Sequence, residues 1–220
     1  GNGPTVVLVP GAGSTGSAWK PVISAWGPGW RFVTTSLPGY GGTRERRTET
    51  DTSMAHVAGV VEAVIRKTGE PVHLVGHSFG GLAALAVTLR GRMPLASLSI
   101  IEPPGVGVLA CHGDTPELEA FGRMLGDYKR AFANGQRDAI ANMIDFYGGA
   151  GTFASWPQRV RDYAIETTPV NLLDWSTAHG FAVSRDDLSG IDVPTLLLCG
   201  SNSPAAMQRI IARLGVRIPG

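Results

Sequence analysis

The segment 76–80, with the sequence GHSFG, constrains the fold of this chain more than any other. It fits the pattern G-x-S-x-G and lies directly after the apolar run 72–75 and before a helix predicted over 81–89. At a sharp turn from strand to helix, only small residues fit two positions from the serine, whose hydroxyl is raised above the sheet edge. The N-terminus of the helix favours negative charge there. The pattern predicts a nucleophile at Ser78; the alternative is a serine in an ordinary glycine-rich turn.

Short apolar runs rich in β-branched residues recur along the chain and predict buried strands. These runs cover residues 5–9, 31–35, 72–75, 98–101 and 194–200. The first four alternate with predicted helices, which favours a mostly parallel sheet flanked by helices, an α/β fold. From 103 to about 187 the spacing is helical and no convincing strand follows. We therefore expect a core formed by 1–102 and 191–220, interrupted by a helical cap at 103–190.

Composition and charge narrow the classes of partner. A chain of 220 residues is long enough for one large domain, or for one domain that carries an insertion. A net charge of +1 gives no general reason to bind nucleic acid or an anionic membrane. The sequence has no apolar run of about 18 residues and no signal-peptide pattern at its start, so we expect a cytoplasmic protein. Cys111 and Cys199 are far apart in sequence, so we expect two reduced thiols and no metal site.

Three sequence blocks resemble the α/β-hydrolase superfamily, in particular its esterase-like branch. VLVPGAG at 7–13 resembles the strand and oxyanion loop, with Pro10 in the place of a common histidine. LPGYG at 37–41 resembles the D-x-P-G-x-G block, and VGHSFGG at 75–81 is the nucleophile elbow. The resemblance implies that Ser78 attacks a carboxylic ester. It also implies an oxyanion hole formed by the backbone N–H groups of Ala12 and Phe79.

The position of the catalytic acid is open. In most of the family it follows the strand after the cap, where this chain has Ser203. Another branch places it after the strand before the cap, where this chain has Glu102. We favour Glu102, since a carboxylate there could orient a histidine; the alternative is a solvated residue at the cap hinge. Asp186, Asp187 and Asp192 are expected to be loop and capping residues.

The catalytic histidine is expected beyond Gly220, because the family supplies it after one more strand; on this interpretation the chain is truncated at its C-terminus. His56, His73 and His112 are not expected to replace it, and His179 is a weak candidate. Residues expected near the substrate are Gly11, His77, His179 and Trp175. The cap also supplies Phe146, Tyr147, Phe153 and Trp156, some of which we expect to line an apolar pocket. No metal or organic cofactor is implied, because a nucleophile, a base and backbone donors suffice.

Three alternatives to a serine esterase remain. The segment 11–16 fits G-x-G-x-x-G, which suggests a dinucleotide-binding fold, but the strand at 31–35 ends without an acidic residue to hold a ribose. The second alternative is a non-catalytic relative that binds a small ligand in the same pocket. The third is a lyase without a cofactor that uses the same residues. The preferred partner is a small, partly apolar ester; nothing in the sequence indicates an oligomeric state.

Overall fold

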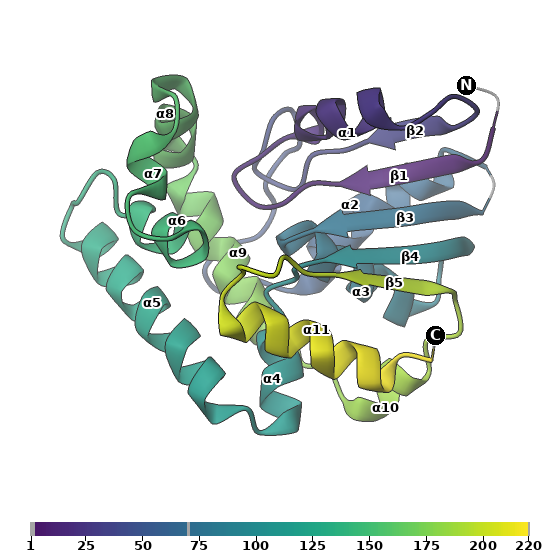
Figure 1. Ribbon diagram of the computed structural model, residues 1–220. Helices are drawn as coiled ribbons and strands as arrows, with labels where there is room; N and C mark the ends of the chain where they lie inside the picture. The colour runs from purple at the N-terminus through teal and green to yellow at the C-terminus, as the bar shows by residue number, and fades with distance from the viewer. Residues whose placement is uncertain (1–2, 70, 220) are drawn as a thin grey trace.

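The computed structural model describes residues 3–69 and 71–219. At its centre lies a five-stranded sheet in the order β2-β1-β3-β4-β5, with every neighbouring pair parallel (Figure 1). The strands are β1 (Thr5–Val9), β2 (Arg31–Thr34), β3 (Val72–His77), β4 (Leu95–Ile101) and β5 (Thr195–Leu198). This sheet, flanked by helices, confirms the predicted α/β fold class.

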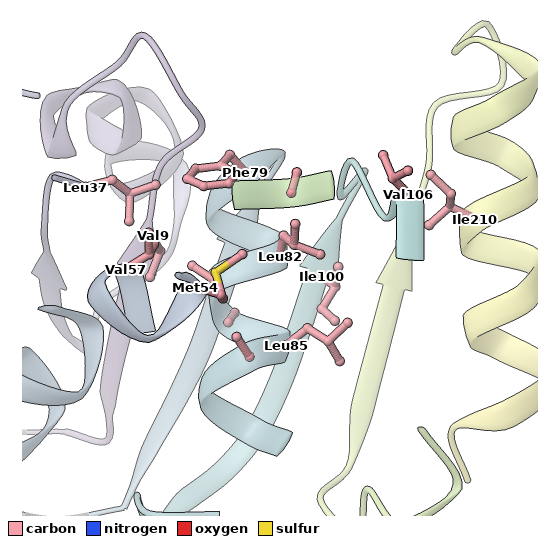
Figure 2. Packing of buried hydrophobic residues seen from close by; sticks show 14 of the residues in the cluster. Val9, Leu37, Met54, Val57, Phe79, Leu82, Leu85, Ile100, Val106 and Ile210 are labelled. Carbon is pink, nitrogen blue, oxygen red and sulfur yellow. The ribbon is translucent and has the colours of Figure 1, made fainter. Parts of the chain in front are cut away.

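The two faces of the sheet bury different helices because successive side chains of a strand point in opposite directions. Val7 and Val9 of β1 join a large core with α2 (Met54–Arg66), α3 (Phe79–Arg90) and α11 (Ala205–Arg217). Val6 and Leu8 instead pack against Trp19, which ends the 3-10 helix η1 (Gly16–Trp19) before α1 (Lys20–Ala25). Figure 2 shows the first core, where Leu82 and Leu85 of α3 lie beside Ile100 of β4.

Seven helices lie between β4 and β5 in the described chain. They are α4 (Val106–His112), α5 (Thr115–Ala133), α6 (Ala141–Gly148), α7 (Thr152–Ser155), α8 (Gln158–Glu166), α9 (Thr168–Gly180) and α10 (Arg185–Ser189). In Figure 1, α5 to α8 lie beyond the carboxyl ends of the strands, toward which the arrows point. No strand lies between 102 and 194 among these residues. No helix within 3–69 and 71–219 is long and apolar enough to cross a membrane.

Two element boundaries differ from those expected. Helix α3 begins at Phe79, two residues before the predicted start, because the turn passes directly from the nucleophile position into the helix. Strand β4 begins at Leu95 rather than near residue 98. Its first residues alternate between partly buried and exposed positions, and a single polar residue in this stretch obscures the apolar run in the sequence.

Glycines allow β1, β3 and α3 to approach one another closely. A Cβ atom on Gly76 would lie 2.3 Å from the carbonyl oxygen of Gly80. A Cβ atom on Gly80 would lie 2.3 Å from the carbonyl oxygen of Pro10. Each contact is with backbone, which cannot move aside as a flexible side chain could. The small residues that flank Ser78 in the sequence motif are therefore required by packing.

We expect Gly76→Ala to destabilise the protein by about 3 kcal/mol or more, because the new methyl group overlaps backbone. In a chain of this size, that loss lowers the thermal unfolding midpoint by roughly 6–12 °C. The matched control is Gly59→Ala in the middle of α2, where a Cβ meets nothing within 4 Å. It should raise stability by about 0.5–1 kcal/mol. Equal midpoints for the two variants in a thermal scan would contradict the close-packing explanation.

Candidate active site

Ser78 occupies a strained turn at the start of α3. Its backbone has φ 52° and ψ −127°, and it is one of two non-glycine residues with positive φ in the described chain. Such a conformation costs about 1–3 kcal/mol and persists only where the surrounding structure enforces it. The Ser78 N–H donates to the carbonyl of Ile101 at 2.8 Å, and the Ser78 carbonyl accepts from Gly81 and Leu82. These bonds hold the turn between β3, β4 and α3.

The Ser78 side chain lines a cavity of about 80 Å³. The other lining residues are Ala12, Phe79, Pro104, Met143, Tyr147, Asn171, Asp174, Trp175 and Ala178. Ala12 and Phe79 were expected to supply the oxyanion hole, and Trp175 was expected near the substrate. Neither the Ala12 nor the Phe79 N–H donates a hydrogen bond within the part of the chain that the structure describes. Both residues line the same cavity as Ser78.

Gly11, His77 and His179 do not line this cavity. A Cβ on Gly11 would lie 3.0 Å from the Ser78 Cβ and 3.5 Å from the Ser78 Oγ, so Gly11 lies close to the serine side chain. Gly11 and His77 line a separate cavity of about 160 Å³. His77 directly precedes Ser78, and successive strand residues point to opposite faces. His179 is exposed near the end of α9, with Nδ1 3.0 Å from the carbonyl oxygen of Trp175.

Glu102 lies directly across from Ser78 at the ends of neighbouring strands. The register pairs His77 with Ile101, and Ser78 and Glu102 each follow one residue later. Glu102 has φ 49°, the second positive value outside glycine among the described residues. Its Oε1 accepts from the Gly200 N–H at 2.7 Å and from the Ser203 hydroxyl. Burial raises the pKa of Glu102, but these hydrogen bonds outweigh burial and hold the pKa below its usual value. A carboxylate is therefore present at this position.

No histidine of the described chain forms a hydrogen bond with Ser78 or Glu102. His56 pairs with Asp51 and His73 with Ser97, whereas His112 and His179 each contact a backbone carbonyl in their own helix. Similarly, no group of three or more His, Cys, Asp and Glu side chains within 3–69 and 71–219 could hold a metal ion.

A buried polar network beside the cavity was missed by the sequence analysis. The Tyr40 hydroxyl donates to Asp174 Oδ2 at 2.6 Å, and Arg47 Nη2 lies 2.8 Å from Asp174 Oδ1. Arg47 also donates to Glu45 and Thr177, and its guanidinium lies 5.8 Å from the centre of the Phe79 ring. Burial raises the pKa of Asp174 to about 7, although Arg47 and Tyr40 favour its charged form. The network ties the loop after β2 to helix α9.

One sequence signal points weakly to this network. Asn171, Asp174 and Thr177 recur every three residues along α9, and all three side chains are buried, with 2% exposure or less. Polar residues at this spacing usually mark the solvent-exposed face of a helix. Only the structure distinguishes a buried polar face from an exposed one, because the partners Tyr40 and Arg47 lie far away in the sequence.

We expect Ser203→Ala to lower the free energy of unfolding only at pH values at which Glu102 is ionised. The lowered pKa of Glu102 means that its hydrogen bonds stabilise the fold above the unfolded-state pKa and that this contribution is lost as pH falls through the folded-state pKa. The difference from wild type in urea unfolding should be about 1 kcal/mol or less at neutral pH, because Glu102 is only partly buried. It should shrink as pH falls below the ordinary glutamate pKa of about 4.3, and it should disappear once the pH is below the lowered folded-state pKa of Glu102. The control is Ser201→Ala, at a nearby exposed serine. A difference independent of pH would argue against the assigned bond.

Removal of Arg47 alone should be far more damaging than removal of the whole ion pair. Arg47→Met leaves Asp174 buried without its counter-charge and should cost about 3–5 kcal/mol. In the double variant Arg47→Met/Asp174→Leu, only Glu45 loses its partner, and its side chain is partly exposed to solvent, so most of that stability should return. Arg46→Met, at the neighbouring exposed position, controls for general loss of positive charge. Urea unfolding measures all three; a double variant no more stable than Arg47→Met alone would contradict the coupling.

Comparison with known proteins gives matches over the length of the chain. A model described as the alpha/beta hydrolase family matches residues 6–220. Pimeloyl-acyl-carrier-protein methyl ester esterases from Vibrio campbellii and Aeromonas hydrophila are 30% and 32% identical, over 44% and 59% of this chain. The matched regions span 36% and 51% of those relatives, so this chain aligns with about half of their length or less.

Two further matches cover more of the chain. The (E)-2-((N-methylformamido)methylene)succinate hydrolase of Acinetobacter baylyi is 24% identical over 93% of this chain and 74% of its own length. A hydrolase structure from Oleispira antarctica superposes with a TM-score of 0.74 at 17% identity. That superposition covers 100% of this chain and 81% of the other. At this identity, the structural likeness shows a shared fold.

Proposed function

Because the chain belongs to the alpha/beta hydrolase family, we propose that it is a serine hydrolase that cleaves small, partly apolar carboxylic esters through an acyl-enzyme. The observation that carries this proposal is the backbone of Ser78, with φ 52° at the N-terminus of α3 and beside a cavity. A positive φ at a serine costs conformational free energy and is kept where it serves a function. At this turn it lifts the serine hydroxyl clear of the sheet, where it can react. The esterase and hydrolase names of its relatives support the same class of reaction.

The proposed reaction begins when Ser78 Oγ attacks the ester carbonyl carbon. A histidine takes the Ser78 proton, and the carbonyl oxygen becomes an oxyanion near the N–H groups of Ala12 and Phe79. Collapse of this intermediate expels the alcohol, which receives the proton from the histidine. Water then attacks the acyl-enzyme by the same route and releases the acid. The free N–H donors support this role, because donors fixed in advance need no reorganisation during the reaction.

Glu102 is the proposed acid of the triad, and the base is a histidine from outside the described residues. The position of Glu102 supports this role: His77 pairs with Ile101, and Ser78 and Glu102 are the next residues along β3 and β4. A carboxylate there would hold a histidine in the correct tautomer and stabilise its protonated form. Ser203 and Gly200 then act on the acid indirectly, because their hydrogen bonds favour its ionised state.

The helices α4 to α10 are the proposed cap over the substrate. Met143, Tyr147 and Trp175 from these helices supply apolar surface to the cavity at Ser78. With a volume of about 80 Å³, this cavity suits a short acyl group. One observation favours a second candidate function, a non-catalytic ligand-binding protein: no histidine side chain of the described residues forms a hydrogen bond with Ser78 or Glu102.

Labelling with a fluorophosphonate tests the proposed function. The phosphorus should attach to Ser78, as seen by intact mass and peptide mapping, and Ser78→Ala should abolish labelling. Ser99→Ala, at a serine outside the cavity, should label as wild type does. Because the base is proposed to come from elsewhere, added imidazole should accelerate the Ser78-dependent reaction of the 220-residue chain. A serine that remains unlabelled with imidazole present would favour the ligand-binding alternative.

A further inference from the structure

We propose that Tyr147 is a specificity-determining residue whose hydroxyl donates a hydrogen bond to an uncharged acceptor, a ketone oxygen, on the acyl chain of the substrate. This inference rests on the proposed function only in taking the cavity at Ser78 as the site of the acyl group. It adds a substrate class, oxoacyl esters, to the general class of small esters.

The Tyr147 hydroxyl has no hydrogen-bond partner in the described part of the protein. The hydroxyls of the other three tyrosines, Tyr40, Tyr128 and Tyr163, each form a hydrogen bond with another residue. Within 3–69 and 71–219, no hydrogen bond reaches the Tyr147 oxygen. A tyrosine hydroxyl that is removed from water ordinarily has a partner. The protein therefore leaves one phenolic donor unused.

This unused donor is open to a small molecule in the cavity at Ser78. Four polar side-chain atoms of the described residues lack both a hydrogen bond and accessible surface, and the Tyr147 oxygen is not among them. The unbonded Tyr147 oxygen therefore keeps accessible surface, although the residue as a whole is not exposed. Tyr147 lines the cavity of about 80 Å³ beside Ser78. Burial nonetheless raises the pKa of Tyr147 well above its usual value. An atom that is both accessible and strongly desolvated faces an enclosed cavity rather than bulk water.

Aromatic neighbours hold the Tyr147 ring in place. Tyr147 belongs to α6, and its ring centre lies 5.3 Å from that of Phe146 and 6.5 Å from that of Phe121. The Tyr147 and Phe146 rings meet edge to face, a favourable arrangement for two aromatic side chains. A donor that is already fixed loses little conformational entropy when a ligand binds. The hydroxyl is thus oriented before the substrate arrives.

The electrostatic surroundings of Tyr147 select an uncharged acceptor. The negative charge of Glu102 acts together with burial to raise the pKa of Tyr147, so the phenol stays protonated and remains a donor. The same charge opposes a carboxylate on the ligand. A ketone oxygen accepts a hydrogen bond without bringing a second charge into a site where desolvation is expensive. The apolar side chains of Met143 and Trp175 suit the remainder of a short acyl chain.

A pair of isosteric esters tests this selectivity without any chemistry at Ser78. Ethyl 3-oxobutanoate and ethyl 3-methylbut-3-enoate differ by the exchange of one ketone oxygen for one CH2 group. Each is titrated into the Ser78→Ala variant, with and without Tyr147→Phe, and followed by protein-observed NMR. Tyr147→Phe should weaken binding of the oxo ester on the order of fivefold, through the loss of one hydrogen bond. Binding of the methylene ester should change by less than about twofold.

Tyr163→Phe is the matched control for binding. It removes the same atom from a tyrosine that does not line this cavity, and it should leave both affinities unchanged. An equal effect of Tyr147→Phe on the two esters, no effect on either, or no binding of either ester to the Ser78→Ala variant would overturn the proposal.

Thermal unfolding distinguishes recognition from a structural role. Tyr147→Phe in the otherwise unchanged protein should leave the unfolding midpoint equal to that of wild type or higher, because it removes a polar atom that has no partner in the described fold. Tyr128→Phe is the comparison: it leaves the buried Asn171 Oδ1 without its donor and should lower the midpoint. A midpoint lowered equally by the two variants, or failure of Tyr147→Phe to fold, would assign the Tyr147 hydroxyl to structure and overturn the proposal.

These outcomes remain separate from those of the labelling experiment. Ser78 that reacts with a fluorophosphonate, together with an equal effect of Tyr147→Phe on the two esters, would retain the serine hydrolase and reject the oxoacyl preference. Ser78 that does not react, together with a selective fivefold loss for the oxo ester, would retain the recognition by Tyr147 and reject catalysis.

Discussion

The close approach of β1, β3 and α3 is the constraint on which the rest of the structure depends. Gly76 and Gly80 bring backbones together at distances that exclude any side chain. That approach forces the intervening Ser78 into a left-handed conformation that few residues other than glycine adopt. The same packing presents the N-terminus of α3 and the loop with Ala12 to one cavity. The backbone thus brings the proposed nucleophile and the two proposed oxyanion-hole donors to the same cavity.

The second constraint is the burial of charge between the core and α9. Arg47 and Asp174 are both almost completely buried, and the Tyr40 hydroxyl binds the same carboxylate. Because a stranded charge would be so costly, the network fixes α9 relative to the loop after β2. The Arg47 guanidinium also lies over the ring of Phe79, the residue that follows Ser78. The side chains that stabilise this part of the fold therefore lie next to the proposed site.

Features that depend on contiguous residues could be predicted from the sequence, whereas those that depend on distant partners could not. The elbow at 76–80 and the alternation of strands and helices are local, so the fold class and the position of Ser78 followed from them. The lining of the cavity depends on how α9 packs against the core. Tyr40 and Asp174 are separated by 134 positions, and no local pattern pairs them. Gly11, His77 and His179, which the sequence predicts near the substrate, do not line the cavity at Ser78.

A crystal structure of the protein phosphonylated at Ser78 would test the central claim most directly. The account predicts a bond between phosphorus and Ser78 Oγ, with the phosphoryl oxygen about 2.7–3.1 Å from the backbone nitrogens of both Ala12 and Phe79. An adduct whose phosphoryl oxygen points into solvent, away from these two N–H groups, would contradict it.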